Sequence, residues 1–417
     1  MNKQPCVAIV GAGASGLAAA LTLHREGFSG KILLLERMDR VGKKILSTGN
    51  GRCNLGNIDL SPRHYHSRNP KALQAALEEM PLEKTQAFFQ NSGLLLRQEE
   101  GRLYPLCNQA AMVLDVLRLE LEDAGIPMHT QAPVSKIDLG KHGYRLTLGS
   151  GEVLQATWVI LATGGKAAPK LGSDGSGYDL ARSLGHTVTP LYPALVPIKG
   201  RDRIFHGLKG VRAQGKVRLC RGKEILAQEQ GEIQFTDYGL SGIPLLQLSC
   251  LLPQAGDQGI LSLDLLPEQT FQQVEALLAQ RAHESRYATL EQLLLGTIPK
   301  KLAFALLKSL GFASLSRTVD TLKEQELRRI ARALKDWPME VSGTLGWDQA
   351  QVTGGGVALE EIFPQTMESK RCPGLYLTGE LLDVVGDCGG YNLHWAWNTG
   401  RLAGEAIAAQ ERAFRRS

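Results

Sequence analysis

The chain has no pair of cysteines in a C-x-x-C spacing, although it contains seven cysteines among 417 residues. Their number is odd and they are scattered along the chain, at Cys6, Cys53, Cys107, Cys220, Cys250, Cys372 and Cys388. This pattern disfavours both a disulfide framework and a structural zinc site, so no metal is expected. It favours a protein of a reducing compartment, the cytoplasm.

Long hydrophobic runs are also scarce. Residues 6–23 carry no charge and follow Lys3, as in a signal peptide, but they contain three glycines and lead to no clear small-residue cleavage site. No later segment approaches the roughly twenty apolar residues that a membrane span needs. The excess of positive charge is small, with a formal net charge of +5, which allows a polyanionic partner without requiring one.

The N-terminal segment has the pattern of a dinucleotide-binding βαβ unit. An apolar strand at residues 6–10 is followed by Gly11-x-Gly13-x-x-Gly16 and a helix. A second apolar strand, KILLLE, ends at Glu36, about 20 residues after Gly16. At that spacing an acid accepts hydrogen bonds from ribose hydroxyls, while the pyrophosphate lies on the helix N-terminus. The acid also disfavours the 2′-phosphate of NADP at this site.

Two later segments also contain an apolar strand followed by glycines. ATWVILATGG occupies residues 156–165, and GLYLTGELLDVVGDCGGYNLHWAWNTG occupies residues 374–400, where a helix begins near Asn392. A helix that begins after a glycine pair directs N–H groups toward the electron-rich edge of a flavin ring. The three segments, in this order, resemble the two-dinucleotide-binding-domain flavoproteins. The third segment usually reads Gly-Asp, whereas this chain has Gly379-Glu380.

Four longer motifs resemble one narrower family over essentially the whole chain. They are RVGKKILSTGNGRCN, EIQFTDYGLSGIPLLQLS, QVTGGGV and GDCGGYNLHWAWNTG. The family is that of the aminoacetone-oxidase-like flavoproteins, which includes a bile-acid 4,6-dehydro reductase and a ribosomal RNA dihydrouridine synthase. The resemblance implies non-covalent FAD. Because no second glycine fingerprint offers a stable nicotinamide site, NAD(P)H is expected to act as a transient reductant.

The expected fold is α/β, with a Rossmann-type FAD-binding domain interrupted by an inserted domain. We expect the FAD-binding domain to comprise residues 1–191 and 343–417, and the inserted domain to comprise residues 192–342. Period-two alternation predicts a β-barrel-like part at 192–266, and helical segments predict a helical part at 267–342.

The cofactor-binding residues are expected in the three strand–turn segments and in the glycine-rich loop LSTGNGRCN, which the resemblance places under the FAD. We predict contacts from Gly11, Gly13, Ala14, Ser15, Gly16, Glu36, Arg37, Lys43, Lys44, Ser47, Gly49, Gly51, Arg52, Cys53, Asn54, Val134, Ala162, Thr163, Gly164, Gly379, Glu380, Asp387, Gly390, Tyr391 and Asn392.

Four side chains near the expected flavin ring are candidates for catalysis by proton transfer. Cys53 and Cys388 lie in glycine-rich loops, where filling a tight turn is the alternative interpretation for each. Tyr391 is a candidate proton donor. His394 either polarises a substrate carbonyl or lies on the helix surface and contacts the flavin only through its backbone. Cys388 is preferred as the donor, because its glycine neighbours let a substrate approach closely and a thiol remains protonated at pH 7.

The leading functional hypothesis is an FAD-dependent reductase of a carbon–carbon double bond conjugated to a carbonyl. The substrate is either uracil in 23S rRNA, giving dihydrouridine, or a small enone such as a dehydro bile acid. Hydride would reach the far carbon and a nearby acid would protonate the carbon beside the carbonyl. The alternatives are an amine oxidase of the aminoacetone type and a flavin-binding, RNA-associated protein without turnover.

A basic stretch, residues 199–223, is the candidate RNA contact, because contacts to phosphates dominate nucleic-acid affinity. The nine basic residues, with one acid among them, are Lys199, Arg201, Arg203, Lys209, Arg212, Lys216, Arg218, Arg221 and Lys223. A solvated charged face is the alternative interpretation, and aromatic residues are scarce in the stretch.

Overall fold

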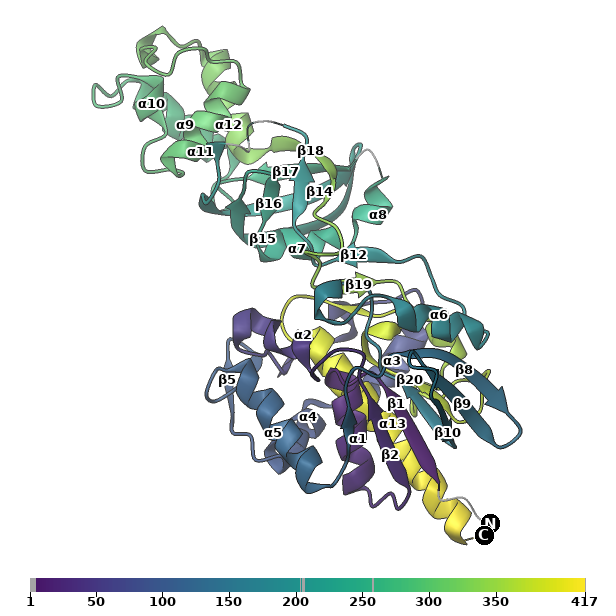
Figure 1. Cartoon of the computed structure of the whole chain (residues 1–417). Helices are drawn as coiled ribbons and strands as arrows, with labels where there is room; N and C mark the ends of the chain where they lie inside the picture. The colour runs from purple at the N-terminus through teal and green to yellow at the C-terminus, as the bar shows by residue number, and fades with distance from the viewer. Residues whose placement is uncertain (1–4, 203, 205–206, 257–258, 417) are drawn as a thin grey trace. The chain divides into compact units, whose positions relative to one another are not determined.

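The computed structural model describes residues 5–202, 204, 207–256 and 259–416, and it divides into two compact units (Figure 1). Unit 1 comprises Met1–Pro193 and Gln351–Ser417, and unit 2 comprises Ala194–Ala350. The boundaries, after residues 193 and 350, lie two and eight residues beyond the expected ones at 191 and 342. Strand β12 (Tyr192–Ala194) pairs with β19 (Val352–Gly354), which keeps residue 192 with unit 1.

Unit 1 is built on a five-stranded parallel sheet in the order β20-β11-β1-β2-β7. Its strands are β1 (Cys6–Val10), β2 (Lys31–Leu35), β7 (Met128–His129), β11 (Trp158–Leu161) and β20 (Leu375–Leu377). The apolar runs of β1 and β11 are buried because both faces of a parallel sheet are covered. The predicted βαβ unit is therefore present, and it lies at the centre of the sheet.

Two helices, α1 (Ala14–Arg25) and α13 (Tyr391–Arg416), pack closely against each other in unit 1 (Figure 1). A Cβ on Gly400 would lie 2.1 Å from the carbonyl oxygen of Ser15, so only glycine permits this approach.

Smaller elements of the unit include α2 (Lys43–Leu46), β3 (Gly56–Asn57), β4 (Tyr65–His66), α3 (Pro70–Glu78), α4 (Leu82–Asn91), β5 (Leu96–Glu99), β6 (Arg102–Pro105), α5 (Ala110–Asp123), β8 (Val134–Gly140), β9 (Gly143–Leu148), β10 (Val153–Ala156), α6 (Ser176–Ser183) and β21 (Val385–Gly386).

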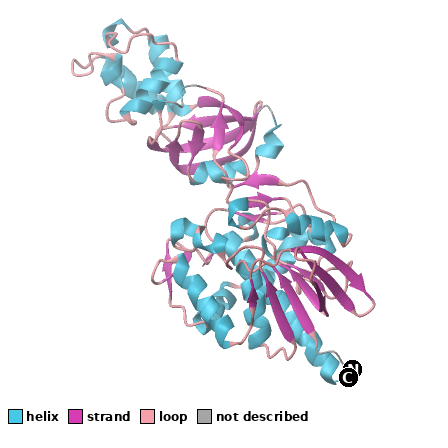
Figure 2. Ribbon diagram, viewed as in Figure 1, coloured by secondary structure: helices cyan, strands magenta, loops and turns pink. Residues whose placement is uncertain are grey.

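Unit 2 combines a closed β-barrel with a group of helices, which Figure 2 separates by colour. The barrel order is β13-β16-β15-β14-β17-β18. Its strands are β13 (Ile198–Gly200), β14 (Arg212–Arg221), β15 (Glu224–Phe235), β16 (Gly239–Ser241), β17 (Gly259–Asp264) and β18 (Trp337–Thr344). The helices are α7 (Ile243–Ser249), α8 (Leu252–Ala255), α9 (Phe271–Ala282), α10 (Leu290–Leu293), α11 (Lys300–Ser309) and α12 (Glu324–Lys335).

The helical part of unit 2 ends earlier than expected. Helix α12 stops at Lys335, and strand β18 returns to the barrel and closes it by pairing with β17 and β13. The side chains of Trp337 and Met339 are buried in alternation with exposed Pro338 and Glu340, as in a half-buried strand. The expected helical range up to residue 342 was therefore too long.

Among the described residues, no helix combines the length and the apolar composition that crossing a bilayer requires.

Candidate functional site

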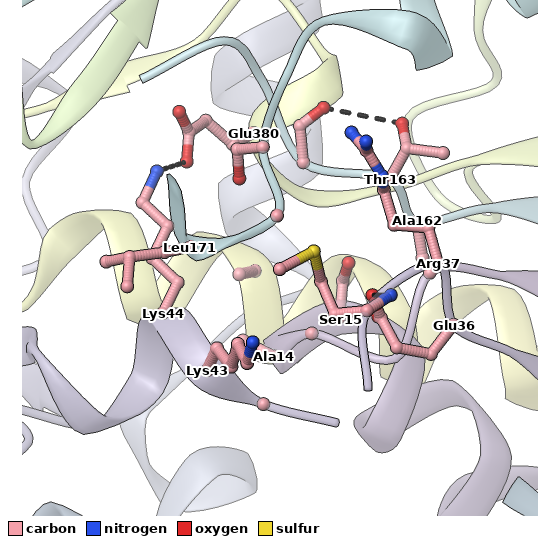
Figure 3. Close-up of a pocket in the computed structure, with 18 of the residues that line it drawn as sticks. Ala14, Ser15, Glu36, Arg37, Lys43, Lys44, Ala162, Thr163, Leu171 and Glu380 are labelled. Atoms are coloured by element: carbon pink, nitrogen blue, oxygen red, sulfur yellow. Dashed lines mark hydrogen bonds and ion pairs between the residues drawn. The ribbon is translucent and has the colours of Figure 1, made fainter. Parts of the chain in front are cut away.

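A cavity of about 290 Å³ opens in unit 1 where three neighbouring strands of the parallel sheet end (Figure 3). Val10 and Gly11 line it at the end of β1, Glu36 lies just after β2, and Ala162 lies just after β11. The crevice at the carboxyl ends of the strands is where open α/β sheets bind their ligands. The cavity therefore has the position of a dinucleotide site.

The three glycines of the first turn are required for different reasons. Gly11 has φ +103°, and a Cβ at this position would lie 2.4 Å from the carbonyl oxygen of Ala162. A Cβ on Gly16 would lie 1.9 Å from the carbonyl oxygen of Gly11. By contrast, a Cβ on Gly13 would meet no protein atom within 4 Å. Gly13 lines the cavity at the N-terminus of α1, so the open space beside it fits a pyrophosphate bound to the helix N-terminus.

Glu36 presents a buried carboxylate to the cavity at the end of β2. Its Oε2 accepts a hydrogen bond from the Ala12 N–H at 3.0 Å, and its Oε1 accepts one from the Met38 N–H at 2.8 Å. These two amides hold the carboxylate in place, and its remaining lone pairs are available to hydroxyl donors. The arrangement fits a ribose.

Lys44 and Glu380 form an ion pair across the cavity, with 2.7 Å between Nζ and Oε2 (Figure 3). Glu380 Oε1 accepts hydrogen bonds from both the N–H and the hydroxyl of Thr353 at 2.9 Å, and the Thr353 hydroxyl oxygen accepts from the Lys166 N–H at 2.7 Å. Glu380, which stands where related flavoproteins usually have aspartate, thus connects its own segment to those of Lys44 and Thr353. Together with Lys43, which also lines the cavity, the donor set suits the phosphates of FAD.

Many of the residues that the sequence predicts to bind the cofactor line this cavity, and others do not. The predicted residues that line it are Gly11, Gly13, Ala14, Ser15, Glu36, Arg37, Lys43, Lys44, Val134, Ala162, Thr163, Gly164, Glu380 and Asn392. The predicted residues outside its lining are Gly16, Ser47, Gly49, Gly51, Arg52, Cys53, Asn54, Gly379, Asp387, Gly390 and Tyr391. Residues that were missed include Thr48, Leu171, Gly172 and Asp174. The glycine-rich LGSDGSG segment was the available signal for the last three.

The glycine-rich loop does not supply the arginine that was expected at the cofactor. Arg52 donates two hydrogen bonds to Glu99, at 2.8 and 2.9 Å, and its guanidinium carbon lies 4.1 Å from the ring centre of Tyr104. The β5–β6 hairpin therefore engages this side chain. Gly49 and Gly51 are exposed, and Thr48 is the residue through which the loop reaches the cavity.

Three of the four candidate proton donors, Cys53, His394 and Tyr391, are buried in the protein interior, the last with 4% exposure. Cys53 is 0% exposed, and burial raises the pKa of its thiol to about 12. His394 is 0% exposed, its Nδ1 lies 3.0 Å from the Tyr65 hydroxyl, and burial lowers its pKa to about 4. Neither Cys53 nor His394 can meet a substrate in this structure. The burial of Cys53 favours the interpretation that it fills a tight turn. The interpretation that His394 lies on the helix surface is wrong, because its side chain is fully buried.

The candidates Cys388 and Tyr391 flank the turn Gly389-Gly390. A Cβ on Gly390 would lie 2.5 Å from Asn54 Oδ1, so the turn packs directly on the end of the glycine-rich loop. Cys388 is half-buried. Burial is the main cause that raises the pKa of Tyr391 to about 12. The turn begins α13, and Asn392 in the first turn of that helix lines the cavity.

The glycine run of QVTGGGV has a packing role. Cβ atoms on these glycines would lie 2.2 Å from the Tyr192 ring, 2.3 Å from the Pro190 carbonyl oxygen and 2.6 Å from Leu382. Close approach of the run is therefore to other parts of the protein. The preceding Gln351 and Val352 line the cavity.

Most of the basic stretch of unit 2 is paired with acids. The ion pairs are Arg201–Glu340 (3.9 Å), Lys209–Asp237 (3.0 Å), Arg212–Glu232 (3.1 Å), Arg218–Asp336 (3.2 Å) and Arg221–Glu224 (2.8 Å). Arg203 lies outside the described residues. The acids come from barrel strands, from the β15–β16 turn and from the residue that precedes β18, and they offset much of the local charge that the sequence suggests.

The fold and the cavity define a Rossmann-type flavoprotein with an inserted barrel-and-helix unit. The chain belongs to the family described as HI0933-like protein Rossmann domain, whose profile matches residues 5–406. It is an FAD-dependent oxidoreductase, and the resemblance and fold class predicted from its motifs are confirmed.

Two curated relatives and one solved structure are similar to the chain over nearly its full length. The 3-dehydro-bile acid delta(4,6)-reductase of Clostridium scindens is 41% identical over 98% of this chain and 99% of its own. The ribosomal RNA dihydrouridine synthase of Haemophilus influenzae is 30% identical over 96% of this chain and 98% of its own. A crystal structure of 3-ketosteroid delta1-dehydrogenase from Sterolibacterium denitrificans has a TM-score of 0.50 at 14% identity, covering 98% of this chain and 100% of its own, and shares the fold.

Proposed function

We propose that the protein reduces a carbon–carbon double bond conjugated to a carbonyl in a small enone, with NAD(P)H as the reductant. The observation that carries the proposal is the 41% identity to a 3-dehydro-bile acid delta(4,6)-reductase across nearly all of both chains. The ion pairs along the basic stretch support a small substrate over RNA. The amine oxidase alternative is not favoured, because this relative is named a reductase.

The residues of unit 1 have separate tasks in this reaction. Bound FAD supplies the hydride that reaches the far carbon of the enone. The N-terminus of α1 beside Gly13 would hold the pyrophosphate, Glu36 the ribose, and Lys43 and Lys44 would offset negative charge. We propose that the half-buried Cys388, just before the start of α13, borders the substrate.

Anaerobic half-reactions test the proposed activity. We expect NADH or NADPH to bleach the yellow holoenzyme and a 3-dehydro-Δ4,6 bile acid to restore its colour with formation of the reduced bile acid. Stopped-flow absorbance and mass spectrometry of the product would measure both steps. Bleaching by aminoacetone, with no reoxidation by the bile acid, would contradict the proposal and restore the oxidase hypothesis.

Reversing the charge of residues in the basic stretch tests whether RNA is the substrate. The 30% identity to a ribosomal RNA dihydrouridine synthase is the reason to test this alternative. We expect the triple variant Arg212→Glu, Lys216→Glu, Arg218→Glu to bind 23S rRNA fragments within about threefold of the wild type at 150 mM salt. Loss of an extensive phosphate interface would instead lower the affinity steeply and reduce the dependence of log K on log salt. Fluorescence anisotropy would measure both, with FAD content as the control for folding.

Such a loss would overturn the small-molecule preference. A matched variant of unit 1, Lys71→Glu, Lys84→Glu, Lys141→Glu, removes the same number of positive charges outside the basic stretch. An equal effect of both variants would show that only net charge matters.

A further inference from the structure

A carboxylate that binds two histidines lies beside the Gly389-Gly390 turn of unit 1. Asp387 Oδ2 lies 3.0 Å from His64 Nδ1, and Asp387 Oδ1 lies 2.8 Å from His66 Nε2. Asp387 is among the residues predicted to bind the cofactor, and neither histidine is among the predicted site residues. Neither Asp387 nor the histidines line the dinucleotide cavity.

Regular structure holds this cluster in place. Strand β4 pairs with β21, with Tyr65 opposite Gly386 and His66 opposite Val385. The Asp387 N–H donates a hydrogen bond to the His64 carbonyl oxygen at 2.9 Å. The two histidines are therefore positioned by a backbone ladder that leads directly into the glycine turn and α13.

The His64 ring lies against Tyr391, the first residue of α13. The ring centres are 4.7 Å apart and the ring planes are 17° from parallel. Tyr391 itself is buried, with 4% exposure, so the half-buried Cys388 and His64 are more accessible to a substrate than Tyr391 is. The His64 side chain is 23% exposed, which leaves a route to substrate and to solvent.

The surroundings of His64 Nε2 accommodate both the protonated and the neutral ring. Asp59 Oδ2 lies 3.2 Å from Nε2 and can accept its proton, whereas the Arg63 Nε–H lies 3.2 Å from the same atom and can donate to it when the proton has left. The pKa of Asp59 is lowered to about 2, first by the Ser61 N–H and then by His64. Asp59 therefore remains an acceptor at neutral pH.

We propose that His64 is the catalytic proton donor of the enone reduction, with its ring fixed through Nδ1 by Asp387. The proposal rests on the proposed function and concerns the protonation step that follows hydride transfer. A general acid must be stable with and without its proton, and exchangeable partners at Nε2 provide that. Asp59, Arg63, Asp387 and Tyr391 are the charged or titratable groups that face the ring.

The proton balance of the step is simple. Hydride forms a new C–H bond at the far carbon, and the electron pair of the double bond shifts to give an enolate. The carbon beside the carbonyl then forms a bond to the proton on His64 Nε2, and the N–H electron pair stays on the ring. Solvent returns a proton to the ring. NAD(P)H provides the two electrons, so each turnover saturates one carbon–carbon double bond, and a 3-dehydro-Δ4,6 bile acid loses one of its two double bonds per NAD(P)H.

The kinetic test compares reoxidation of reduced holoenzymes by a 3-dehydro-Δ4,6 bile acid. We expect His64→Gln to be slower than the wild type by about 10²-fold, the scale of a lost general acid. Ferricyanide takes up electrons without protonating carbon, so its reduction should be unchanged. The matched control is His142→Gln, an exposed histidine of the β8–β9 turn. Cys388→Ala is measured in parallel, because its thiol borders the proposed substrate site and is the competing proton donor.

A labelling test uses the wild type, so it is decisive even where a variant does not fold. Diethyl pyrocarbonate modifies the oxidised holoenzyme, and peptide mass spectrometry follows each histidine. We expect the bile acid to protect His64 at least tenfold and to leave His142 unprotected. Absence of protection would overturn the assignment.

The two kinds of failure are separable. Wild-type holoenzyme that the bile acid does not reoxidise would overturn the proposed function and this assignment with it. Wild-type activity with an equally fast His64→Gln variant would overturn the assignment alone. If Cys388→Ala stalls and His64→Gln does not, the donor is the thiol.

Discussion

Replacement of Gly13 by valine is expected to give a protein that folds but contains little FAD. A Cβ at this position meets no protein atom within 4 Å, and the backbone, with φ −86°, is open to any residue. The valine side chain would therefore occupy the space beside the α1 N-terminus that we assign to the pyrophosphate. We expect less than about a tenth of the wild-type FAD content.

The measurement is the ratio of absorbance at the flavin and protein bands, together with chromatography of the FAD that heat releases from the wild type. Circular dichroism of the apoproteins shows whether the variant is folded. Gly140→Val is a matched control, since Gly140 is exposed in β8 outside the cavity and its Cβ would only touch Gly143 at 3.5 Å. Full FAD content in Gly13→Val would refute the assignment of the first glycine motif.

Gly16→Ala is expected to lower the free energy of unfolding of the apoprotein by at least about 3 kcal/mol, near or beyond the upper end for overpacking. Its Cβ would lie 1.9 Å from the Gly11 carbonyl oxygen and 3.1 Å from the Gly11 carbonyl carbon. Backbone atoms cannot rotate away as a side chain can. The Gly11 N–H also donates to the Leu35 carbonyl oxygen at 2.8 Å, so a shift of this turn would disturb β1 and β2 together.

Urea unfolding of the apoproteins, followed by circular dichroism, would measure this loss. Gly13→Ala is the matched control, because it adds the same methyl group three residues earlier where space is open; we expect a change within about 0.5 kcal/mol. Equal stabilities of the two variants would contradict the packing role of Gly16. The pair therefore separates a glycine that shapes the protein from one that makes room for the ligand.

The site was predictable wherever its chemistry depends on neighbours in the chain. The spacing from Gly11 to Glu36 determines a strand, a turn, a helix and a second strand, because glycines and apolar runs act over a few residues. The alternation along β14 likewise predicted a barrel-like part. Hydrogen bonds within one βαβ unit join residues that are close in sequence, so their pattern can be read without a fold.

The sequence predictions that the structure does not support depend on contacts between segments that are distant in the chain. Arg52 looked available to the cofactor, but a hairpin that begins over forty residues later brings Glu99 to it. Cys53 and His394 lie in motifs typical of a site, yet packing buries both completely. Arg218 appeared to contribute to an RNA surface, but it pairs with Asp336, the residue that precedes β18. The partners of Arg52, His394 and Arg218, which are Glu99, Tyr65 and Asp336, are all distant from them in sequence.

The sequence by itself determined the dinucleotide turn, the family and the chemistry of an FAD-dependent oxidoreductase. Only the tertiary structure decided which polar side chains remain exposed to a substrate, because burial and ion pairing arise from contacts between distant segments. The His64–Asp387 contact joins residues that are 323 positions apart, through a two-residue ladder with no sequence signature. Such a contact exists only after β4 and β21 have met, and it is there that we place the proton donor.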